Sequence, residues 1–238
     1  MNTKIPKIIH YCWFGYGKMP EKYSAYIEGW KRILPDYRFI IWNEENFDVN
    51  CTIYSSQAYQ QKKFAFVSDV ARVYALNSMG GIYLDTDVEM INSPLKLFED
   101  YSVILGTENA DEGTIGTGFI ASVAGSILMT KMMNYYNTHN FIKQDGKLDT
   151  LANTTIIANI LKKEFNLSAD NKIQKNKDIV IYPKEYFTAF DNEICRAAIT
   201  ENTCCIHHFA DSWSTTEGKV KRRVKMLINR ATQYLKTI

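Results

Sequence analysis

Hydrophobic positions along this chain alternate between short runs with the length of a strand and longer segments with helical spacing. The short runs lie at 7–13, 37–42, 82–84, 103–105, 119–122, 179–182 and 204–208. Helices are predicted between them at 21–34, 62–79, 126–138 and 150–165, while 43–60 is expected to be irregular or weakly helical. Strands that alternate with helices in this way are typical of an α/β fold with a mostly parallel central sheet flanked by helices.

Length and composition are those of one globular domain with a full core. The chain has 238 residues, of which 46% are hydrophobic and 23% charged. Its first residues lack the apolar stretch of a signal peptide, and no run approaches the ~20 apolar residues that span a bilayer. The five cysteines are odd in number and form no CxxC pair, which is typical of reduced thiols, so we expect a cytoplasmic protein.

The net charge of +2 hides an asymmetry between the body and the tail. From Lys219 onward there are seven basic residues and no acidic one, so residues 1–218 hold 21 of the 28 bases and all 26 acids, a net charge of −5. A mildly acidic body excludes a nucleic-acid footprint over the whole surface. We therefore divide the chain into a domain at 1–216 and a basic C-terminal segment at 217–238. The segment 217–235 predicts an amphipathic helix that either packs on the domain or lies on an anionic membrane surface.

Two carboxylates follow the short apolar run at 82–84. Asp85 and Asp87 are separated by one residue, so an extended backbone would point both side chains to the same side. Ligands of open α/β sheets bind beyond the carboxyl ends of strands, and hard oxygen donors suit Mn²⁺ or Mg²⁺ bound together with phosphate oxygens. A solvated turn is the alternative interpretation of such a pair, and the apolar strand before it makes that alternative less favourable.

Three further groups of residues are candidates for catalysis or ligand binding. Asp69 and Arg72 share one face of the predicted helix at 62–79 in an apolar neighbourhood, where they form either a functional pair or a surface ion pair. Trp13 ends the first predicted strand and offers either a stacking face for a nucleotide base or a core side chain. The C-terminal stretch provides imidazole, carboxylate, hydroxyl and indole groups at His207, His208, Asp211, Ser212 and Trp213. The two histidines should face opposite sides of an extended chain, so one of them at most reaches a metal site, and a core histidine is the alternative.

The order of these motifs resembles a known enzyme family. The segments that carry the resemblance are 5–15 (IPKIIHYCWFG), 35–37 (PDY), 42–44 (WNE), 64–72 (FAFVSDVAR) and 80–87 (GGIYLDTD), followed by 146–150 with Asn153, 181–183 with Tyr186 and Phe187, and 206–208 with Ser212 and Trp213. Together they resemble the DXD-containing glycosyltransferase family 32. That family includes bacterial capsular and surface-polysaccharide transferases and a yeast initiating α-1,6-mannosyltransferase. The same motif order resembles the catalytic domain of the large clostridial glucosylating toxins.

The resemblance implies a GT-A fold and a divalent cation, Mn²⁺ or Mg²⁺, that holds the diphosphate of a nucleotide sugar. By position it implies metal ligation by Asp85, Asp87 and a group of the C-terminal loop, for which we select His208 over His207, Asp211 or Ser212. It implies donor contacts by Trp13, Ser68, Asp69, Arg72, Tyr83, Asp85, Ser212 and Trp213. It implies catalytic roles for Asp69, Arg72, Asp85, Asp87 and, more loosely, Asn153.

The implied activity is retaining transfer of a hexose, with UDP-hexose favoured by Trp13 and GDP-mannose as the alternative. We expect a glycan or lipid-linked acceptor in surface polysaccharide synthesis, contacted by residues of 106–150 that include Glu108, Asp111 and Glu112. The expected location is the cytoplasm, with peripheral attachment at the inner face of the cell membrane as an option. The alternatives are a toxin- or effector-type protein glycosyltransferase and a nucleotide-sugar-binding module without turnover. A metal-dependent phosphohydrolase would require more clustered acids and histidines than this sequence shows.

Overall fold

The computed structural model describes residues 5–98, 100–191 and 196–209 and is built around one mixed sheet. The sheet order is β2-β1-β3-β6-β5-β8-β7. The strands are β1 (Ile8–Cys12), β2 (Arg38–Trp42), β3 (Gly81–Leu84), β5 (Val103–Asn109), β6 (Thr114–Ser122), β7 (Gln174–Lys175) and β8 (Ile179–Tyr182). β2, β1 and β3 are parallel to one another, β6 is antiparallel to β3 and β5, and β8 is parallel to β5. Five of the seven strands therefore point the same way, and β6 and β7 run in the opposite direction.

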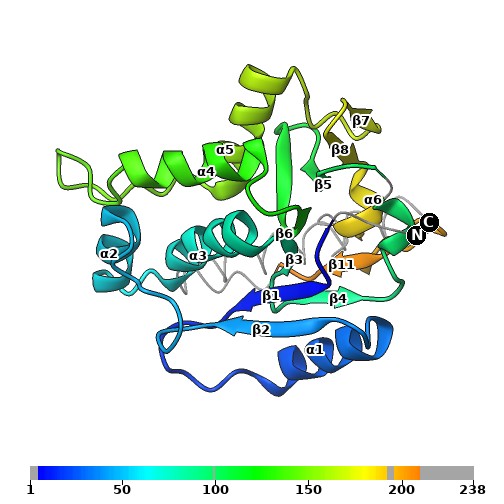
Figure 1. The fold of residues 1–238 in the computed structure, drawn as a ribbon, viewed down its shortest axis with the longest axis horizontal. Helices are drawn as coiled ribbons and strands as arrows, with labels where there is room; N and C mark the ends of the chain where they lie inside the picture. Colours follow the sequence, from blue (N-terminus) through cyan, green and yellow to red (C-terminus); the bar gives the residue numbers. More distant parts are fainter. Residues whose placement is uncertain (1–4, 99, 192–195, 210–238) are drawn as a thin grey trace, which may run out of the picture.

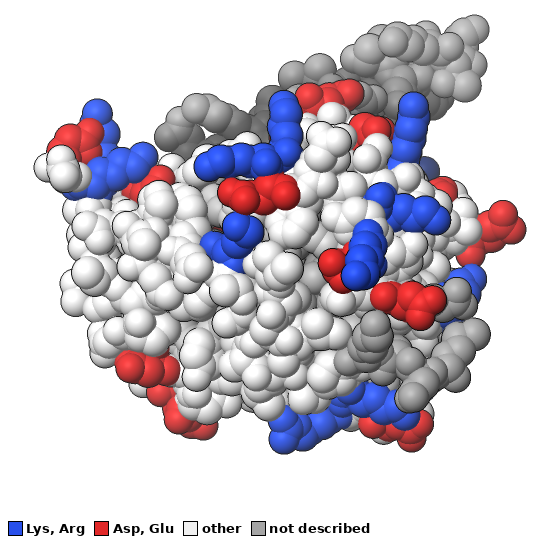
Figure 2. Space-filling view, turned by 45° about the horizontal axis from the view of Figure 1, so that its top comes forward, with Lys and Arg blue, Asp and Glu red and all other residues white. Residues whose placement is uncertain are grey.

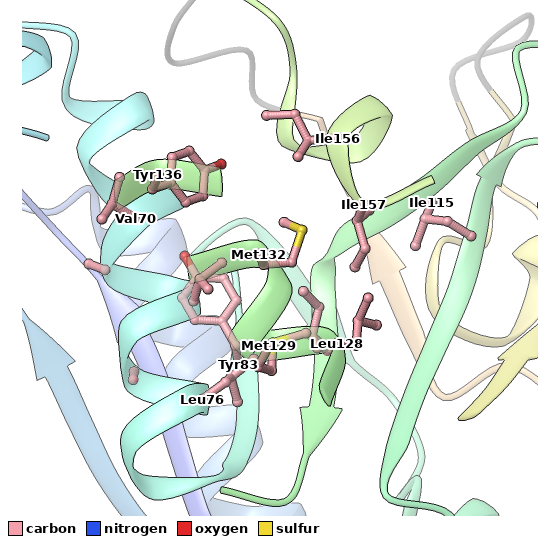
Figure 3. Close-up of a cluster of buried hydrophobic side chains, with 14 of the residues drawn as sticks. Val70, Leu76, Tyr83, Ile115, Leu128, Met129, Met132, Tyr136, Ile156 and Ile157 are labelled. Atoms are coloured by element: carbon pink, nitrogen blue, oxygen red, sulfur yellow. The ribbon is translucent and has the colours of Figure 1, made fainter. Parts of the chain in front are cut away.

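Helices cover both faces of this sheet (Figure 1). Helix α1 (Glu21–Ile33) lies on one face, and α2 (Ile53–Gln60), α3 (Phe64–Met79), α4 (Ile127–Thr138) and α5 (Asn153–Ile160) lie on the other. The core is correspondingly divided into two clusters. The α1 side contains Ile27 and Trp30 of that helix. Figure 3 shows part of the other cluster, in which Val70, Leu76, Tyr83, Ile115, Leu128, Met129, Met132, Tyr136, Ile156 and Ile157 pack together.

Local sequence signals explain where the helices begin and end. α1 ends before Pro35, and α3 ends at Gly80, whose φ of +64° favours glycine. A Cβ atom at Gly80 would lie 2.6 Å from the backbone nitrogen of Ala124, so no other residue fits this reversal. α2 begins at Thr52, whose hydroxyl accepts from the Ser55 amide in a reciprocal capping box. Because that cap lacks the usual Glu or Gln at its third position, the segment 43–60 gives only a weak helical signal.

A buried histidine joins the first three strands. The His10 side chain on β1 is 0% exposed, and Trp42 of β2 donates its indole N–H to His10 Nδ1 at 3.1 Å. Because an indole nitrogen only donates, the His10 proton lies on Nε2 and is donated to the Gly80 carbonyl at 2.8 Å. The neutral imidazole thus fixes the beginning of β3 relative to β1 and β2.

A second, two-stranded sheet lies beside the first. It pairs β4 (Val88–Met90), which follows the acidic motif directly, with β11 (Cys205–His207) in antiparallel register. The remaining elements are two short 3₁₀ or π turns at Leu95–Leu97 and Leu161–Phe165, helix α6 (Lys184–Phe187), and the pair β9 (Phe190–Asp191) and β10 (Arg196–Ala197). The pairing of β4 with β11 brings the C-terminal part of the described chain to the turn after β3, where the His208 amide donates to the Asp87 carbonyl.

The predicted α/β fold with a mostly parallel central sheet is confirmed. The predicted strands and helices are present, but β5 extends to Asn109 rather than 105 and β6 begins at Thr114 rather than 119. β6 differs from a parallel arrangement because it returns antiparallel from β5 through a short turn. The boundary at 216 and 217 and the predicted tail helix lie outside the described residues.

Among the described residues, no helix combines the length and the apolar character needed to cross a bilayer. On the face shown in Figure 2, basic and acidic side chains are interspersed rather than gathered into a field of one sign.

Candidate active site

The candidate site lies at the carboxyl ends of β1 and β3. β1 is the central strand of the parallel part, with β2 on one side and β3 on the other. The chain passes from β1 to its neighbour β2 and then crosses to β3 on the opposite side of β1. The strand order therefore reverses between β1 and β3, which is a topological switch point. Open α/β sheets bind ligands in the crevice at such a point. Trp13 follows β1 and Asp85 follows β3, so both lie at this end of the sheet.

A turn brings the two acids together. The Asp85 amide donates to the Gly118 carbonyl of β6 at 2.9 Å, and the Val88 amide donates back to the Asp85 carbonyl at 3.0 Å. Thr86 and Asp87 occupy the turn between β3 and β4. Our expectation of a common side in an extended strand was therefore wrong about the backbone, although both carboxylates do face one point.

That point is shared with His207. Its Nε2 atom lies 3.2 Å from Asp87 Oδ1 and 3.8 Å from Asp85 Oδ2. One ligand atom from each of the three residues lies within 4.8 Å of the others, which is the arrangement of a three-ligand cation site. Burial lowers the pKa of His207, but the hydrogen bond to Asp87 and the charges of Asp87, Asp85 and Glu108 outweigh it, so the net shift is upward. Two carboxylates and one imidazole are donors that Mn²⁺ accepts readily.

His208, which we had selected as the ligand, lies elsewhere. Its Nε2 atom is 2.8 Å from Glu89 Oε2, and its ring stacks on Tyr26 of α1 with centroids 5.1 Å apart. The correction follows from strand geometry, because neighbouring residues of an extended chain face opposite sides and the β4 pairing turns His207 toward the acids. Asp211, Ser212 and Trp213, the other candidates of this stretch, lie outside the described residues.

Arg72 of α3 connects the remaining charged groups. Its Nη2 atom is 2.8 Å from Asp85 Oδ1 and 3.5 Å from the Tyr83 hydroxyl, and its Nη1 atom is 3.3 Å from Asp69 Oδ1. The Tyr83 hydroxyl donates to Asp85 Oδ1 at 2.9 Å, and the guanidinium carbon lies 4.5 Å from the centre of the Tyr83 ring. The Arg72 residue is only 4% exposed. A buried cation with three oxygen partners is positioned to hold the Asp85 carboxylate in one orientation.

Asp69 is only partly compensated by this arginine. Burial raises its pKa to about 6, with Arg72 lowering it and Asp85 raising it. Because the closer Arg72 contact is with Asp85, the guanidinium is shared and leaves Asp69 with a perturbed proton affinity. A buried carboxyl group with a perturbed pKa in a crevice is a typical property of functional sites.

Asn153 begins α5 beside the same network. Its Nδ2 atom donates to the Tyr136 hydroxyl at 2.8 Å, and the charges of Asp69 and Arg72 act on that tyrosine. Asn153 Oδ1 is buried and has no hydrogen-bond partner within the part of the chain that the structure describes. The structure therefore connects the predicted residue Asn153 to the Tyr136 hydroxyl and leaves Asn153 Oδ1 without a hydrogen-bond partner among the described residues.

Trp13 and Ser68 each donate a hydrogen bond to a nearby backbone carbonyl. The half-buried indole of Trp13 donates to the Gly17 carbonyl, which ties down the loop after β1. Its ring meets Tyr23 of α1 edge to face at 6.1 Å. The Ser68 hydroxyl donates to the Phe64 carbonyl at 3.1 Å, so in this structure it bonds within its own helix rather than into the crevice.

Sequence reasoning missed two residues near the acidic turn, Tyr23 and Gly118. Burial raises the pKa of Tyr23, and the Asp87 charge adds to it, which places this phenol near the acidic turn. A Cβ atom at Gly118 would lie 3.0 Å from His207 Nδ1 and 3.3 Å from Asp85 Oδ2. A glycine inside a strand is the sequence signal of such a close approach, whereas nothing in the α1 sequence distinguishes Tyr23.

Comparisons with known proteins agree with this geometry. Residues 20–109 match the family model described as "Glycosyltransferase sugar-binding region containing DXD motif". Inositol phosphoceramide mannosyltransferase 3 of Schizosaccharomyces pombe (strain 972 / ATCC 24843) is 34% identical over 95 residues, which are 37% of this chain and 25% of that protein. Inositol phosphoceramide mannosyltransferase 1 of the same yeast is 31% identical over 96 residues, 36% of this chain and 28% of that protein. The chain thus spans about a quarter of the length of these curated relatives.

Among solved structures, the PaToxG glycosyltransferase superposes with a TM-score of 0.55 and 19% identity over 68% of this chain and 70% of that chain. At this identity the likeness shows the fold. The fold is of the GT-A type, with the acidic turn at the carboxyl end of β3. Through residues 20–109, this chain is similar to the sugar-binding region of glycosyltransferases that contain a DXD motif.

Proposed function

We propose that the protein is a metal-dependent, retaining glycosyltransferase that moves a hexose from a nucleotide sugar to an acceptor hydroxyl. The observation that carries the proposal is the convergence of Asp85, Asp87 and His207 on one point, next to a buried Arg72. These residues fit a divalent cation because one oxygen of each carboxylate and one imidazole nitrogen lie within 4.8 Å of one another. A cation held there supplies charge stabilisation for the diphosphate leaving group.

The chain's own residues then orient the donor. Arg72 fixes Asp85 and adds a positive charge at the crevice, which favours the negative charge that develops on the departing phosphate. Asp69 has a carboxylate oxygen suited to accept hydrogen bonds from sugar hydroxyls. Trp13 offers an aromatic face at the end of β1, where a base attached to the same diphosphate would stack.

Retention follows if the acceptor attacks the face of the sugar from which the phosphate leaves. The bond between the anomeric carbon and the phosphate oxygen breaks, the bond to the acceptor oxygen forms on the same face, and the acceptor proton passes to the leaving phosphate. Asp69 and Asp85 are both paired with Arg72, which makes them poor nucleophiles. A trapped covalent sugar–enzyme adduct would contradict this mechanism.

The donor we favour is a UDP-hexose, with GDP-mannose as the second candidate. Trp13 and the toxin-like order of motifs favour UDP-hexose, whereas the curated relatives are named as inositol phosphoceramide mannosyltransferases, which supports GDP-mannose as the second candidate. For the acceptor we propose a glycan or lipid-linked saccharide of surface polysaccharide synthesis, with a protein acceptor, as for a toxin or effector, as the alternative.

A peripheral membrane position belongs to this proposal through the basic segment at 217–238. Sedimentation with anionic vesicles tests it. Replacement of the basic residues of this segment by glutamate should abolish co-sedimentation if the segment binds lipid, and unchanged co-sedimentation would remove this part of the proposal.

The decisive experiment is a donor screen. The protein is incubated with UDP-glucose, UDP-galactose or GDP-mannose, with Mn²⁺ or with a chelator, and release of the nucleoside diphosphate is measured. Asp87→Asn should reduce metal-dependent release by about 100-fold or more, because it removes a charged ligand. Asp36→Asn is the matched control, since Asp36 is an exposed acid paired only loosely with Lys7 at 3.9 Å. Metal-dependent donor binding without release would instead identify a binding module.

A further inference from the structure

The two nitrogens of His207 have different surroundings. Nε2 faces Asp85 and Asp87, as described above. Nδ1 is buried, and within the described residues it has no hydrogen-bond partner. Buried polar atoms almost always have a partner, so an imidazole nitrogen in this position calls for one.

A metal-bound histidine needs that partner for a second reason. A ligating imidazole presents one unprotonated nitrogen to the cation, so its proton must lie on the other nitrogen. In most metal sites that N–H is donated to a carboxylate, a carbonyl or water, which fixes the tautomer and the ring orientation. For His207 the acceptor of this N–H must therefore lie on the Nδ1 side of the ring.

Three carboxylates act electrostatically on His207, and two of them are already assigned. Asp87 and Asp85 lie on the Nε2 side, which leaves Glu108 as the third. Glu89, another acid of this region, is paired with His208 at 2.8 Å. Glu108 lies near the end of β5, and its carboxyl group is affected by burial, which raises its pKa, and by His207, which lowers it.

The glycines of β6 leave room for both side chains. A Cβ atom at Gly118 would lie 3.0 Å from His207 Nδ1, and one at Gly116 would lie 3.8 Å from the Cβ atom of Glu108. His207 and Glu108 thus both pack against positions of β6 that have no side chain. A bulkier residue at Gly118 would occupy the space next to the Nδ1 atom.

We propose that Glu108 is a positioning residue: when a cation binds between Asp85 and Asp87, the Glu108 carboxylate accepts the Nδ1 proton of His207, a hydrogen bond that this structure does not contain, and so presents Nε2 to the cation. The inference rests on the proposed metal-dependent function. Glu108 differs in this role from the acceptor contact that the sequence suggested, because it acts through His207 rather than on a substrate.

Two readouts test the proposal on the full chain. Free Mn²⁺ is measured by electron paramagnetic resonance during titration of the wild type, Glu108→Ala, Glu108→Gln and the control Glu112→Gln. Glu112 also acts on the Glu108 carboxyl but belongs to the exposed hairpin tip. Glu108→Ala should weaken Mn²⁺ binding about 10-fold, while the amide oxygen of Glu108→Gln restores most of it and Glu112→Gln leaves it unchanged. Circular dichroism verifies that each variant folds.

The tautomer of His207 is read by ¹⁵N NMR with Mg²⁺ in place of the paramagnetic ion, using His207→Gln to assign the signal. The wild type should carry its proton on Nδ1, and Glu108→Ala should give a mixture of tautomers. Unchanged Mn²⁺ affinity and an unchanged tautomer in Glu108→Ala would overturn the proposal, as would a higher KM for the acceptor with unaltered Mn²⁺ binding.

The same experiments separate this inference from the proposed function. A wild type that binds Mn²⁺ with the expected Glu108 dependence but releases no nucleotide supports the inference and contradicts the function. Metal-dependent release of the nucleotide, together with unchanged Mn²⁺ affinity and an unchanged His207 tautomer in Glu108→Ala, supports the function and contradicts the inference. A wild type that does not bind Mn²⁺ overturns both.

Discussion

The guanidinium of Arg72 meets the carboxylate of Asp85 at 2.8 Å across 13 positions of sequence. The same group contacts Asp69 and the Tyr83 hydroxyl, so one buried cation joins helix α3 to the acidic turn after β3. Burial opposes the charged form of Arg72, and the neighbouring Asp85 charge more than compensates and raises its pKa. The acidic turn and α3 are therefore coupled through a single side chain.

Removal of that cation should destabilise the protein. Arg72→Met leaves Asp69 and Asp85 without their shared partner in a buried site, and we expect a loss of about 3–5 kcal/mol in the free energy of unfolding. Arg72→Lys keeps the charge but not the two-pronged geometry, and should retain more stability while losing most nucleotide release. Urea unfolding measures the first effect and the donor screen measures the second. Equal stability of Arg72→Met and wild type would contradict the coupling.

The space beside His207 exists because residue 118 is a glycine. Gly118→Ala would place a methyl group 3.0 Å from the imidazole and 3.3 Å from Asp85, so the ring must move. We expect a cost of about 1–3 kcal/mol in stability and weaker Mn²⁺ binding. Gly29→Ala is the matched control because its Cβ atom would meet only the Arg32 side chain, at 3.8 Å, on the surface of α1. A Gly118→Ala variant with full metal affinity would show that the ring has room to shift.

His10 should make stability depend on pH. Burial lowers its pKa to about 4 from 6.5, so the folded protein resists protonation of a histidine that the unfolded chain accepts. Its contribution is present above pH 6.5 and is lost as the pH falls through 4, a change of about 3 kcal/mol. His10→Gln should remove this part of the pH profile in urea unfolding, whereas His139→Gln, at an exposed histidine, should not. Parallel profiles of wild type and His10→Gln would refute the assignment.

Asp69 should act in the opposite direction. Its pKa is raised from 3.8 to about 6, so its contribution to stability is greatest below pH 4 and is lost as the pH rises through 6. The change is on the order of 2–3 kcal/mol. Relative to Asp69→Asn, the wild type should therefore become less stable between pH 4 and pH 7. Unfolding of the two proteins over this range measures the difference, and a difference that grows in favour of the wild type would show that Arg72 outweighs burial.

Local patterns in the sequence were sufficient for most of the elements. The helical stripe of Val67, Val70, Ala71 and Tyr74 predicted α3, and Gly80 predicted its end, because both signals depend on a few neighbouring residues. The strands β4, β7, β9 and β10 were not predicted, since two or three residues carry no periodic signal. β11 was predicted as a strand at 204–208, but its pairing with β4 was not, because β4 lies far away in sequence. The same limit applies to the direction of β6, which is decided by its pairing with β5 and β3.

For the site, the sequence by itself determined which residue types are present and in what order, including Asp69, Arg72, Asp85 and Asp87. Only the tertiary structure decided that His207, and not His208, meets the acids. The choice depends on the register of β11 against β4, which places His207 opposite Val88. A shift of one residue in that register would exchange the two imidazoles, and no local property of the sequence distinguishes one register from the other.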